Sequence, residues 1–262
     1  MTAILKKELS SFFTSPLGYV VLAIYYLCAG FFFRWLGCIG YGFGEQDMNP
    51  SGSNDMSLVF SNMFLITILI IPIITMKSFS EEKKQKTDQA LLTSPLGLGE
   101  IVIGKFLGSL VMFLCCMFIY VLLAFSLSFY NAPDWSVFIG NLLGITLLGA
   151  TMIAINIFIS SLTESVIISA IVGIFGGLVM WVSDIVAEKI ATFFEDVFSI
   201  TWFSTAYSNL SFSNHFQNFT TGILRVSDIV FFLSIIALFI FLTLISTVNS
   251  KRITSNSLLI VS

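Results

Sequence analysis

Six long apolar runs constrain this chain more than any other feature of its sequence. Each has about the 17–25 residues that an α-helix needs to cross a hydrocarbon layer some 30 Å thick. Of the 262 residues, 56% are hydrophobic and only 10% are charged, a composition typical of membrane helices. The sequence therefore predicts an all-α polytopic membrane protein with a single transmembrane domain over residues 1–262. The six predicted spans are residues 17–39, 58–76, 106–129, 136–159, 166–183 and 229–248.

The lysines and arginines are distributed unevenly about these spans, and their distribution predicts an orientation. Nine of the twelve lie before the first span, between the second and third, or after the sixth, and three lie on the other side. Cytoplasmic loops carry the excess of basic residues, so we expect both termini and the segment between spans two and three in the cytoplasm. No cleavage-site pattern follows the first run, which predicts an uncleaved span. The chain has no basic stripe, which argues against nucleic-acid binding.

Three segments outside the spans have patterns of their own. Residues 1–13 place Leu5, Leu9 and Phe12 at helical spacings between polar residues, which predicts a short amphipathic helix lying flat on the membrane. Residues 184–227 mix aromatic residues with acids and amides. That mixture favours amphipathic or re-entrant helices at the outer face, with a plain folded loop as the alternative.

The third segment, residues 77–95, is rich in charge and lies between two apolar runs. We expect it to form a cytoplasmic helix from Phe79 to Leu92. Ser78 and Glu81 have the spacing of a capping box at its start. A solvated helix that only links two spans is one interpretation, and a docking element for a cytoplasmic partner is the other.

Short local patterns predict how the chain bends and packs. The sequence Thr14-Ser15-Pro16-Leu17-Gly18 recurs at residues 93–97. Because proline disfavours helix in the residue before it, both copies are expected to break the chain where it turns into the membrane. Pairs of glycines four residues apart permit close helix approach; they are Gly104/Gly108, Gly140/Gly144 and Gly173/Gly177.

The predicted span interiors contain no ionisable residue, which argues against an ion-coupled carrier or a proton pump. Their milder polar residues are candidates either for lining a path or for holding helices together, and packing is the favoured interpretation. Those singled out are Thr67, Asn141, Thr151 and Asn156. His215, the only histidine, has no cysteine, histidine or acidic cluster beside it in sequence, so neither a metal site nor a catalytic base is expected.

Ordered motifs along the chain carry a family resemblance. The run Phe79-Ser80-Glu81-Glu82-Lys83, followed by Thr87-Asp88, Leu91-Leu92 and Ser94-Pro95-Leu96, resembles the first cytoplasmic loop of type-2 ABC transporter permeases. Residues 5–9 resemble the elbow helix of that family, and residues 160–163 resemble its loop between the fourth and fifth spans. His215-Phe216 with residues 222–224 and Asp228 resembles the branch that includes the gliding-motility and nitrous-oxide-reductase-associated permeases. The chain departs from the family at Lys86, where a glycine is frequent.

The resemblance implies a coupling helix that docks on a separate ATPase subunit. The docking residues implied are Phe79, Glu81, Glu82, Lys83, Thr87, Asp88, Leu91 and Leu92, with Lys6, Lys7 and Glu8 as a second contact. The chain has no G-x-x-x-x-G-K-[ST] motif, so ATP and Mg²⁺ are expected on the partner and no cofactor on this chain.

In that interpretation the chain is the permease subunit of an ATP-driven exporter in the bacterial cytoplasmic membrane and is not itself an enzyme. It would move an amphipathic substrate such as a lipid, peptide or glycan-lipid. Its expected partners are membrane lipid, two ATPase copies and a second permease, identical or related, which in this branch sometimes carries an outer-face domain. The competing hypothesis is a non-transporting scaffold or immunity-type subunit that uses residues 77–95 to recruit a cytoplasmic protein.

Overall fold

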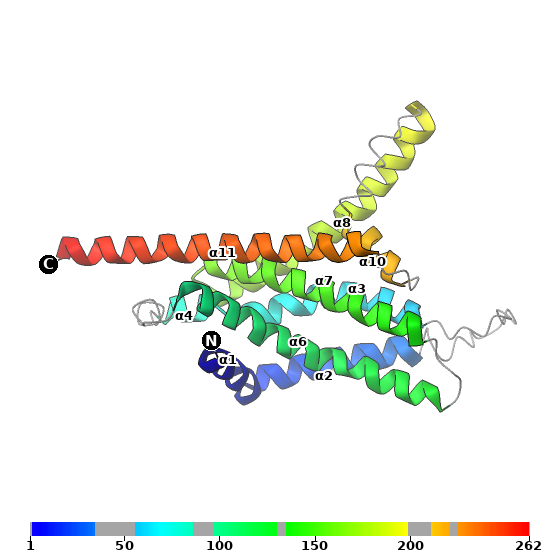
Figure 1. Ribbon diagram of the computed structural model, residues 1–262, viewed down its shortest axis with the longest axis horizontal. Helices are drawn as coiled ribbons and strands as arrows, with labels where there is room; N and C mark the ends of the chain where they lie inside the picture. Colours follow the sequence, from blue (N-terminus) through cyan, green and yellow to red (C-terminus); the bar gives the residue numbers. More distant parts are fainter. Residues whose placement is uncertain are drawn as a thin grey trace, which may run out of the picture.

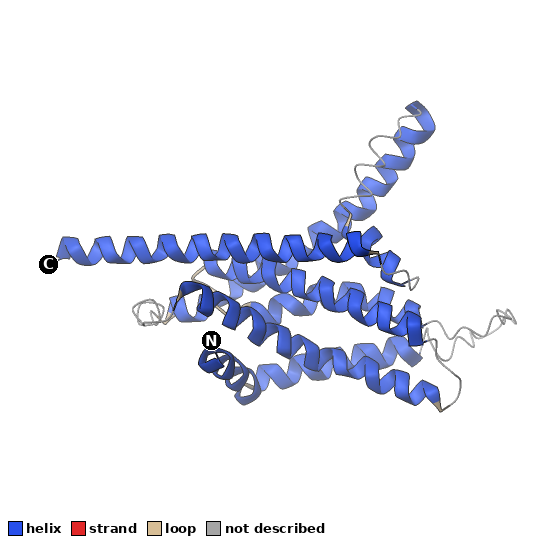
Figure 2. Cartoon of the chain, viewed as in Figure 1, coloured by secondary structure: helices blue, strands red, loops and turns tan. Residues whose placement is uncertain are grey.

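The computed structural model describes residues 2–34, 56–85, 97–129, 135–198, 211–220 and 225–261. This part of the chain is helical throughout, apart from short turns, and contains no strand (Figure 2). Five helices are long and apolar enough to cross a membrane, or six if the bent pair α1 and α2 forms one span. The prediction of an all-α multi-pass membrane protein is confirmed. The helices are α1 (Thr2–Thr14), α2 (Pro16–Phe32), α3 (Met56–Thr75), α4 (Ser80–Lys84), α6 (Leu98–Ser128), α7 (Trp135–Leu162), α8 (Val166–Phe198), α10 (Phe212–Thr220) and α11 (Val226–Val261).

The first two helices meet at a sharp corner, with their axes bent by 74°. Ser15 forms the N-cap of α2, where its Oγ accepts a hydrogen bond from the Leu17 N–H at 3.4 Å, and Pro16 occupies the first helical position. A Cβ on Gly18 would overlap the carbonyl oxygen of Phe12, so only glycine permits this corner. The predicted break at residues 14–18 is therefore confirmed, whereas the second copy lies outside the described residues except for Gly97.

Helix α7 is the centre of the bundle (Figure 1). It contacts α3, α6, α8, α10 and α11, and 61% of its apolar window is buried, against 17% for α8 and for α11. The apolar side chains that α8 and α11 expose are the surface expected to face lipid. The hydrophobic core therefore lies around α7, and α8 and α11 lie at its margin.

Several of the predicted small-residue contacts join helices within this chain. A Cβ on Gly108 would come within 2.8 Å of the Glu8 Cβ, which brings α1 close to α6. A Cβ on Gly144 would lie 2.6 Å from the Cβ of Phe219, and one on Gly177 would lie 2.5 Å from the Ile68 Cγ2. Glycine at these positions lets the neighbouring helix approach to van der Waals contact.

Several helices extend beyond the spans that the sequence predicts, among them α11, which continues past residue 248 to Val261. Two other extensions concern segments discussed above. Helix α8 continues from the predicted end at residue 183 to Phe198, because residues 184–198 contain neither glycine nor proline to stop it. Helix α6 begins at Leu98, before the predicted span start at residue 106, so Lys105 lies within the helix. This second correction determines the functional site.

One end of the bundle gathers α1, α4, the start of α6 and both chain termini (Figure 1). The opposite end carries α10. A chain that crosses the bundle six times returns to the end where it began, so six crossings require both termini at the same end. The assignment of the α1/α4 end to the cytoplasm stays a prediction, as does the placement of α1 on the membrane surface.

Candidate functional site

Four charged side chains meet where α1, α4 and α6 converge, and we call them the charged cluster: Lys7 and Glu8 of α1, Glu82 of α4 and Lys105 of α6. Lys7 Nζ lies 2.8 Å from Glu82 Oε1. Lys105 Nζ lies 2.9 Å from Glu82 Oε2 and 3.0 Å from Glu8 Oε1. Each carboxylate therefore contacts Lys105, and Glu82 bridges the two lysines.

Lys105 is the centre of the cluster, with only 1% of its side chain exposed. A lysine ammonium has three N–H donors, and here they meet Glu8, Glu82 and the backbone carbonyl oxygen of Ser78. The ammonium also lies 4.7 Å from the centre of the Phe79 ring, a cation–π distance. A buried charge is tolerated only when it is paired and hydrogen-bonded, and every donor of Lys105 is satisfied.

The cluster also sets the protonation of Glu82 and Lys7. Burial acts to raise the pKa of the Glu82 carboxyl, but the positive charges of Lys105 and Lys7 and their hydrogen bonds outweigh it, so the pKa is lowered from 4.5. The hydrogen bond to Glu82 raises the pKa of Lys7 above 10.5. Both shifts favour the charged forms, so the salt bridges persist at neutral pH.

Helix α4 is capped by a residue from α7 and not by the predicted Ser78–Glu81 box. Phe79 is the N-cap residue and makes no side-chain cap. The Ser160 Oγ instead accepts hydrogen bonds from the N–H groups of Phe79 and Ser80, at 3.1 and 3.2 Å. Because α4 starts one residue too late for Ser78 to reach its amides, a hydroxyl from another helix takes over the cap.

One further contact completes the attachment of α4. Lys83 Nζ donates a hydrogen bond to the carbonyl oxygen of Ser161. The helix ends at Lys84, with Gln85 at its C-cap, whereas the sequence predicted one helix to Leu92. Its five residues thus contact α1, α6 and the end of α7.

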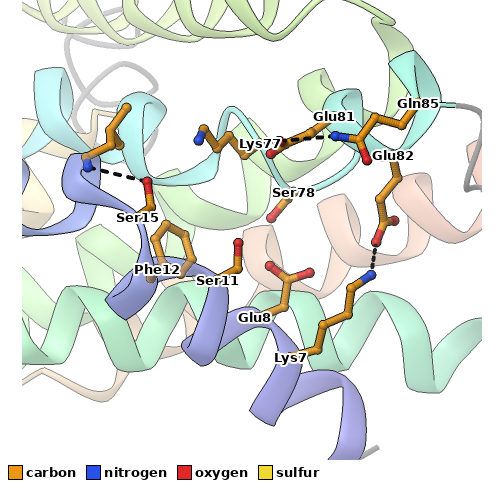
Figure 3. Close-up of a pocket in the computed structure, with 11 residues that line it drawn as sticks. Lys7, Glu8, Ser11, Phe12, Ser15, Lys77, Ser78, Glu81, Glu82 and Gln85 are labelled. Atoms are coloured by element: carbon orange, nitrogen blue, oxygen red, sulfur yellow. Dashed lines mark hydrogen bonds and ion pairs between the residues drawn. The ribbon is translucent and has the colours of Figure 1, made fainter.

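A pocket of about 330 Å³ opens beside the charged cluster, between α1 and the link from α3 to α4 (Figure 3). Its wall combines both signs of charge with hydroxyl and apolar groups. The residues that line it are Lys7, Glu8, Ser11, Phe12, Ser15, Leu17, Lys77, Ser78, Glu81, Glu82 and Gln85.

The structure brings some of the predicted docking residues together and turns several of them inward. Phe79 is buried beneath Lys105, and Glu82 and Lys83 are held by contacts within the chain. Glu81 is half-buried on the pocket wall, and Lys6 is exposed. Thr87, Asp88, Leu91 and Leu92 lie outside the described residues. The docking role of the whole set stays a prediction.

The four polar residues predicted in the span interiors are all buried within the chain. Thr67 is within hydrogen-bond distance of the Tyr25 hydroxyl, at 3.3 Å, and so joins α3 to α2. Asn141, Thr151 and Asn156 donate instead to carbonyl oxygens four residues earlier in α7. The Thr67 side chain therefore joins two helices, whereas the side chains of the other three residues donate hydrogen bonds within their own helix.

At the opposite end, His215 has an acidic partner that its sequence neighbours do not reveal. Its Nδ1 lies 2.7 Å from the Asp228 Oδ1, and its ring stacks on Phe231 at 4.2 Å. Asn218 Nδ2 donates to the other oxygen of Asp228 at 3.1 Å. These contacts hold α10 against α11, and the Asp184 Oδ2 accepts from the Ser213 N–H of α10 at 3.0 Å. The absence of a catalytic or metal role for His215 stays a prediction.

Sequence reasoning missed Lys105 and Ser160 as members of the site. The sequence did contain a signal that Lys105 lies within a helix. Glu100 falls in the first turn of α6, three residues after Gly97, and acidic residues are frequent in the first turn of a helix. Ser160 belongs to the motif at residues 160–163, but nothing in that motif indicates a cap, because this function depends on where α7 ends relative to α4.

The helices and their apolar surfaces define a multi-pass membrane protein. A family model described as ABC-2 family transporter protein matches residues 2–254, nearly the whole chain. The chain therefore belongs to the ABC-2 transporter family, as the motifs of residues 79–96 indicated; the narrower similarity to one branch stays a prediction. Members are membrane transport components and not enzymes, and they generally pair with an ATPase subunit. A comparison with curated proteins gave no match.

Proposed function

We propose that this chain is the permease subunit of an ATP-driven exporter and that a separate ATPase docks at the α1/α4 end. Family membership supports the permease role and the pairing with an ATPase. The observation that carries the proposal is the attachment of α4. This short charged helix is joined to α1 and α6 by the charged cluster and to α7 by Ser160.

That attachment suits a helix that transmits force. Lys105 links α4 to the second turn of a helix of 31 residues, and Ser160 and Ser161 link it to the end of the central helix α7. Packed, hydrogen-bonded elements move as units and do not deform continuously. A displacement of α4 by a partner would therefore shift α1, α6 and α7 together.

The remaining parts of the proposal follow the family resemblance. Two ATPase copies would bind ATP and Mg²⁺, and a second permease, identical or related and in some cases bearing an outer-face domain, would complete the transporter. The location would be the bacterial cytoplasmic membrane, with the α1/α4 end in the cytoplasm. The substrate class is an amphipathic lipid, peptide or glycan-lipid, which the apolar surfaces of α8 and α11 could contact from the bilayer.

The first test is co-purification of the tagged chain from its native host in mild detergent, with mass spectrometry and an ATPase assay. The matched variants are the charge exchange Glu81→Lys/Lys84→Glu in α4, which preserves net charge, and Glu164→Gln in the turn between α7 and α8. We expect a protein with a phosphate-binding loop to co-purify with the wild type and with Glu164→Gln, and to be lost from the charge-exchange variant. A stable preparation without ATPase in several detergents would refute the proposal.

A second arm separates transport from scaffolding. Cross-linking α10 to α7 would hold the end opposite α4 closed while leaving the docking end intact. The permease proposal predicts that the ATPase stays bound but that partner-stimulated ATP turnover falls. Unchanged turnover in the assembled, cross-linked complex would favour the scaffold instead.

A further inference from the structure

We propose that the pocket between α1 and the α3–α4 link binds the zwitterionic headgroup of an aminophospholipid, a phosphoethanolamine group. Nothing in the transporter assignment requires such a site. Three features of the pocket support it. They are one lysine and one glutamate on its wall that remain for a ligand, a buried hydroxyl without a hydrogen-bond partner among the described residues, and its position at the corner between α1 and α2.

The first feature is which charges on the wall remain for a ligand. Lys7 is paired with Glu82, and Glu8 with Lys105. Lys77 and Glu81 also line the pocket, and no ion pair joins Lys77 to any described residue. Within the described part of the chain, the Glu81 carboxylate accepts only a long contact of 3.5 Å from the Gln85 amide. One cation and one carboxylate therefore face the cavity, which complements a ligand that carries a phosphate and an ammonium.

The second feature is the hydroxyl of Ser78, which lies on the same wall next to Lys77 (Figure 3). Ser78 is 3% exposed, and its Oγ has no hydrogen-bond partner among the described residues. A buried, unsatisfied polar group costs about 1–3 kcal/mol, so its persistence beside a pocket indicates a partner that enters from outside. A phosphate oxygen within reach of Lys77 would accept from this hydroxyl.

The third feature is where the pocket lies and what closes its other side. Phe12 and Leu17 line it at the corner of α1 and α2, and Phe13 beside them is 41% exposed. An amphipathic helix bent by 74° from a spanning helix is expected at headgroup depth, which is where the sequence predicts α1 to lie. The apolar lining can cover the glycerol and the start of the acyl chains while Lys77 and Glu81 take the headgroup.

The charge balance selects one headgroup class. Lys7 and Lys105 neutralise Glu82 and Glu8, so the wall leaves Lys77 and Glu81 for a ligand, and a purely anionic headgroup would leave the Glu81 carboxylate without a cation. A primary ammonium can donate hydrogen bonds to Glu81, whereas a quaternary choline group has no N–H to donate. The pocket volume of about 330 Å³ lies in the range of small-ligand sites. Phosphoethanolamine lipid is therefore preferred over phosphocholine and phosphoglycerol lipids.

The test measures lipid binding to the purified full-length chain. Short-chain phosphatidylethanolamine, phosphatidylcholine and phosphatidylglycerol are titrated in detergent, with native mass spectrometry for adducts and thermal unfolding as a second readout. Glycerophosphoethanolamine, which has the headgroup and no acyl chains, distinguishes a soluble ligand from a lipid. We expect saturable binding of the ethanolamine lipid at the lowest concentration.

Variants link the binding to the pocket. Lys77→Gln and Glu81→Gln should each weaken the ethanolamine lipid at least about tenfold, since each removes a charge-assisted hydrogen bond. Lys84→Gln, in the same helix but outside the pocket, should bind like the wild type. Ser78→Ala should weaken binding severalfold without changing any charge, which keeps the test decisive if a charge variant does not fold.

Three results would overturn the inference: equal binding of choline and ethanolamine lipids, equal binding of the soluble headgroup, or full binding by Lys77→Gln and Ser78→Ala. Lipid binding is measured without any ATPase. A failure here leaves the transporter proposal standing, and a chain that recruits no ATPase could still bind this lipid.

Discussion

Replacing Lys105 with methionine tests whether the charged cluster holds α4 in place. The substitution keeps an unbranched apolar side chain as far as Cε, with sulfur in place of Cδ, and removes the ammonium. Glu8 and Glu82, each 12% exposed, then face a site without the cation that both contact, and the Ser78 carbonyl loses its donor. Removing one member of a buried ion pair costs about 3–5 kcal/mol. We therefore expect Lys105→Met to lower the free energy of unfolding by about that amount.

The chain offers a matched control in Lys7→Met. Both lysines contact Glu82, at 2.8 and 2.9 Å, but 59% of the Lys7 side chain is exposed against 1% for Lys105. An exposed pair contributes only about 0–1 kcal/mol. The two lysines therefore lie at nearly the same distance from Glu82 but differ in burial, and Lys105→Met also removes the contacts to Glu8 and to the Ser78 carbonyl.

The measurement is equilibrium unfolding in mixed micelles of a mild detergent and a denaturing one. Adding Glu8→Gln to Lys105→Met should recover part of the loss, because it removes one of the two stranded carboxylates. Equal costs for Lys7→Met and Lys105→Met would refute the reasoning, since burial would then not decide the strength of the pairs.

Three further predictions test other contacts. Ser160→Ala should cost about 1 kcal/mol and speed hydrogen exchange at the Phe79 and Ser80 amides, and unchanged exchange would count against the cap. Because the pKa of Glu82 is lowered from 4.5, its contribution to stability is present above that value and is lost as pH falls through the lower folded pKa; Glu82→Gln should flatten the acid limb of an unfolding-temperature profile. Gly173→Ala should destabilise, because its Cβ would overlap the Asn156 Oδ1, whereas Gly176→Ala, three residues on in α8 with open space, should not; similar thermal shifts would contradict this packing.

The fold was largely predictable because its main determinants are local. A run of about 20 apolar residues is enough to indicate a spanning helix, and the proline after Ser15 is enough to indicate the corner between α1 and α2. The errors lie at helix ends. Helix α8 continues past residue 183 because no local signal stops it, and α6 starts before residue 106. Hydropathy reports where a helix is apolar and not where it begins or ends.

The site was only partly predictable because its contacts are not local. The partners in the charged cluster are 75 residues apart for Lys7 and Glu82 and 97 apart for Glu8 and Lys105. Sequence motifs identified Glu82 and Lys7 as important but assigned both to a partner protein. Lys105 was counted only among the basic residues between the second and third spans, and no partner was predicted for it. Only the fold shows that the three helices converge on it.

The buried charges are better explained as fixing the position of α4 than as a source of stability. An apolar cluster of the same volume is often as stable as a buried ion pair or more so, so stability alone does not require Lys105 in this place. An apolar contact, however, tolerates sliding of a helix of only five residues. The three donors of Lys105 meet three fixed acceptors, and the Ser160 hydroxyl fixes the N-terminus of the same helix. These contacts hold α4 in one register against α1, α6 and α7. In the proposed function, α4 transmits the movement of a partner, and a fixed register matters more for that function than added stability does.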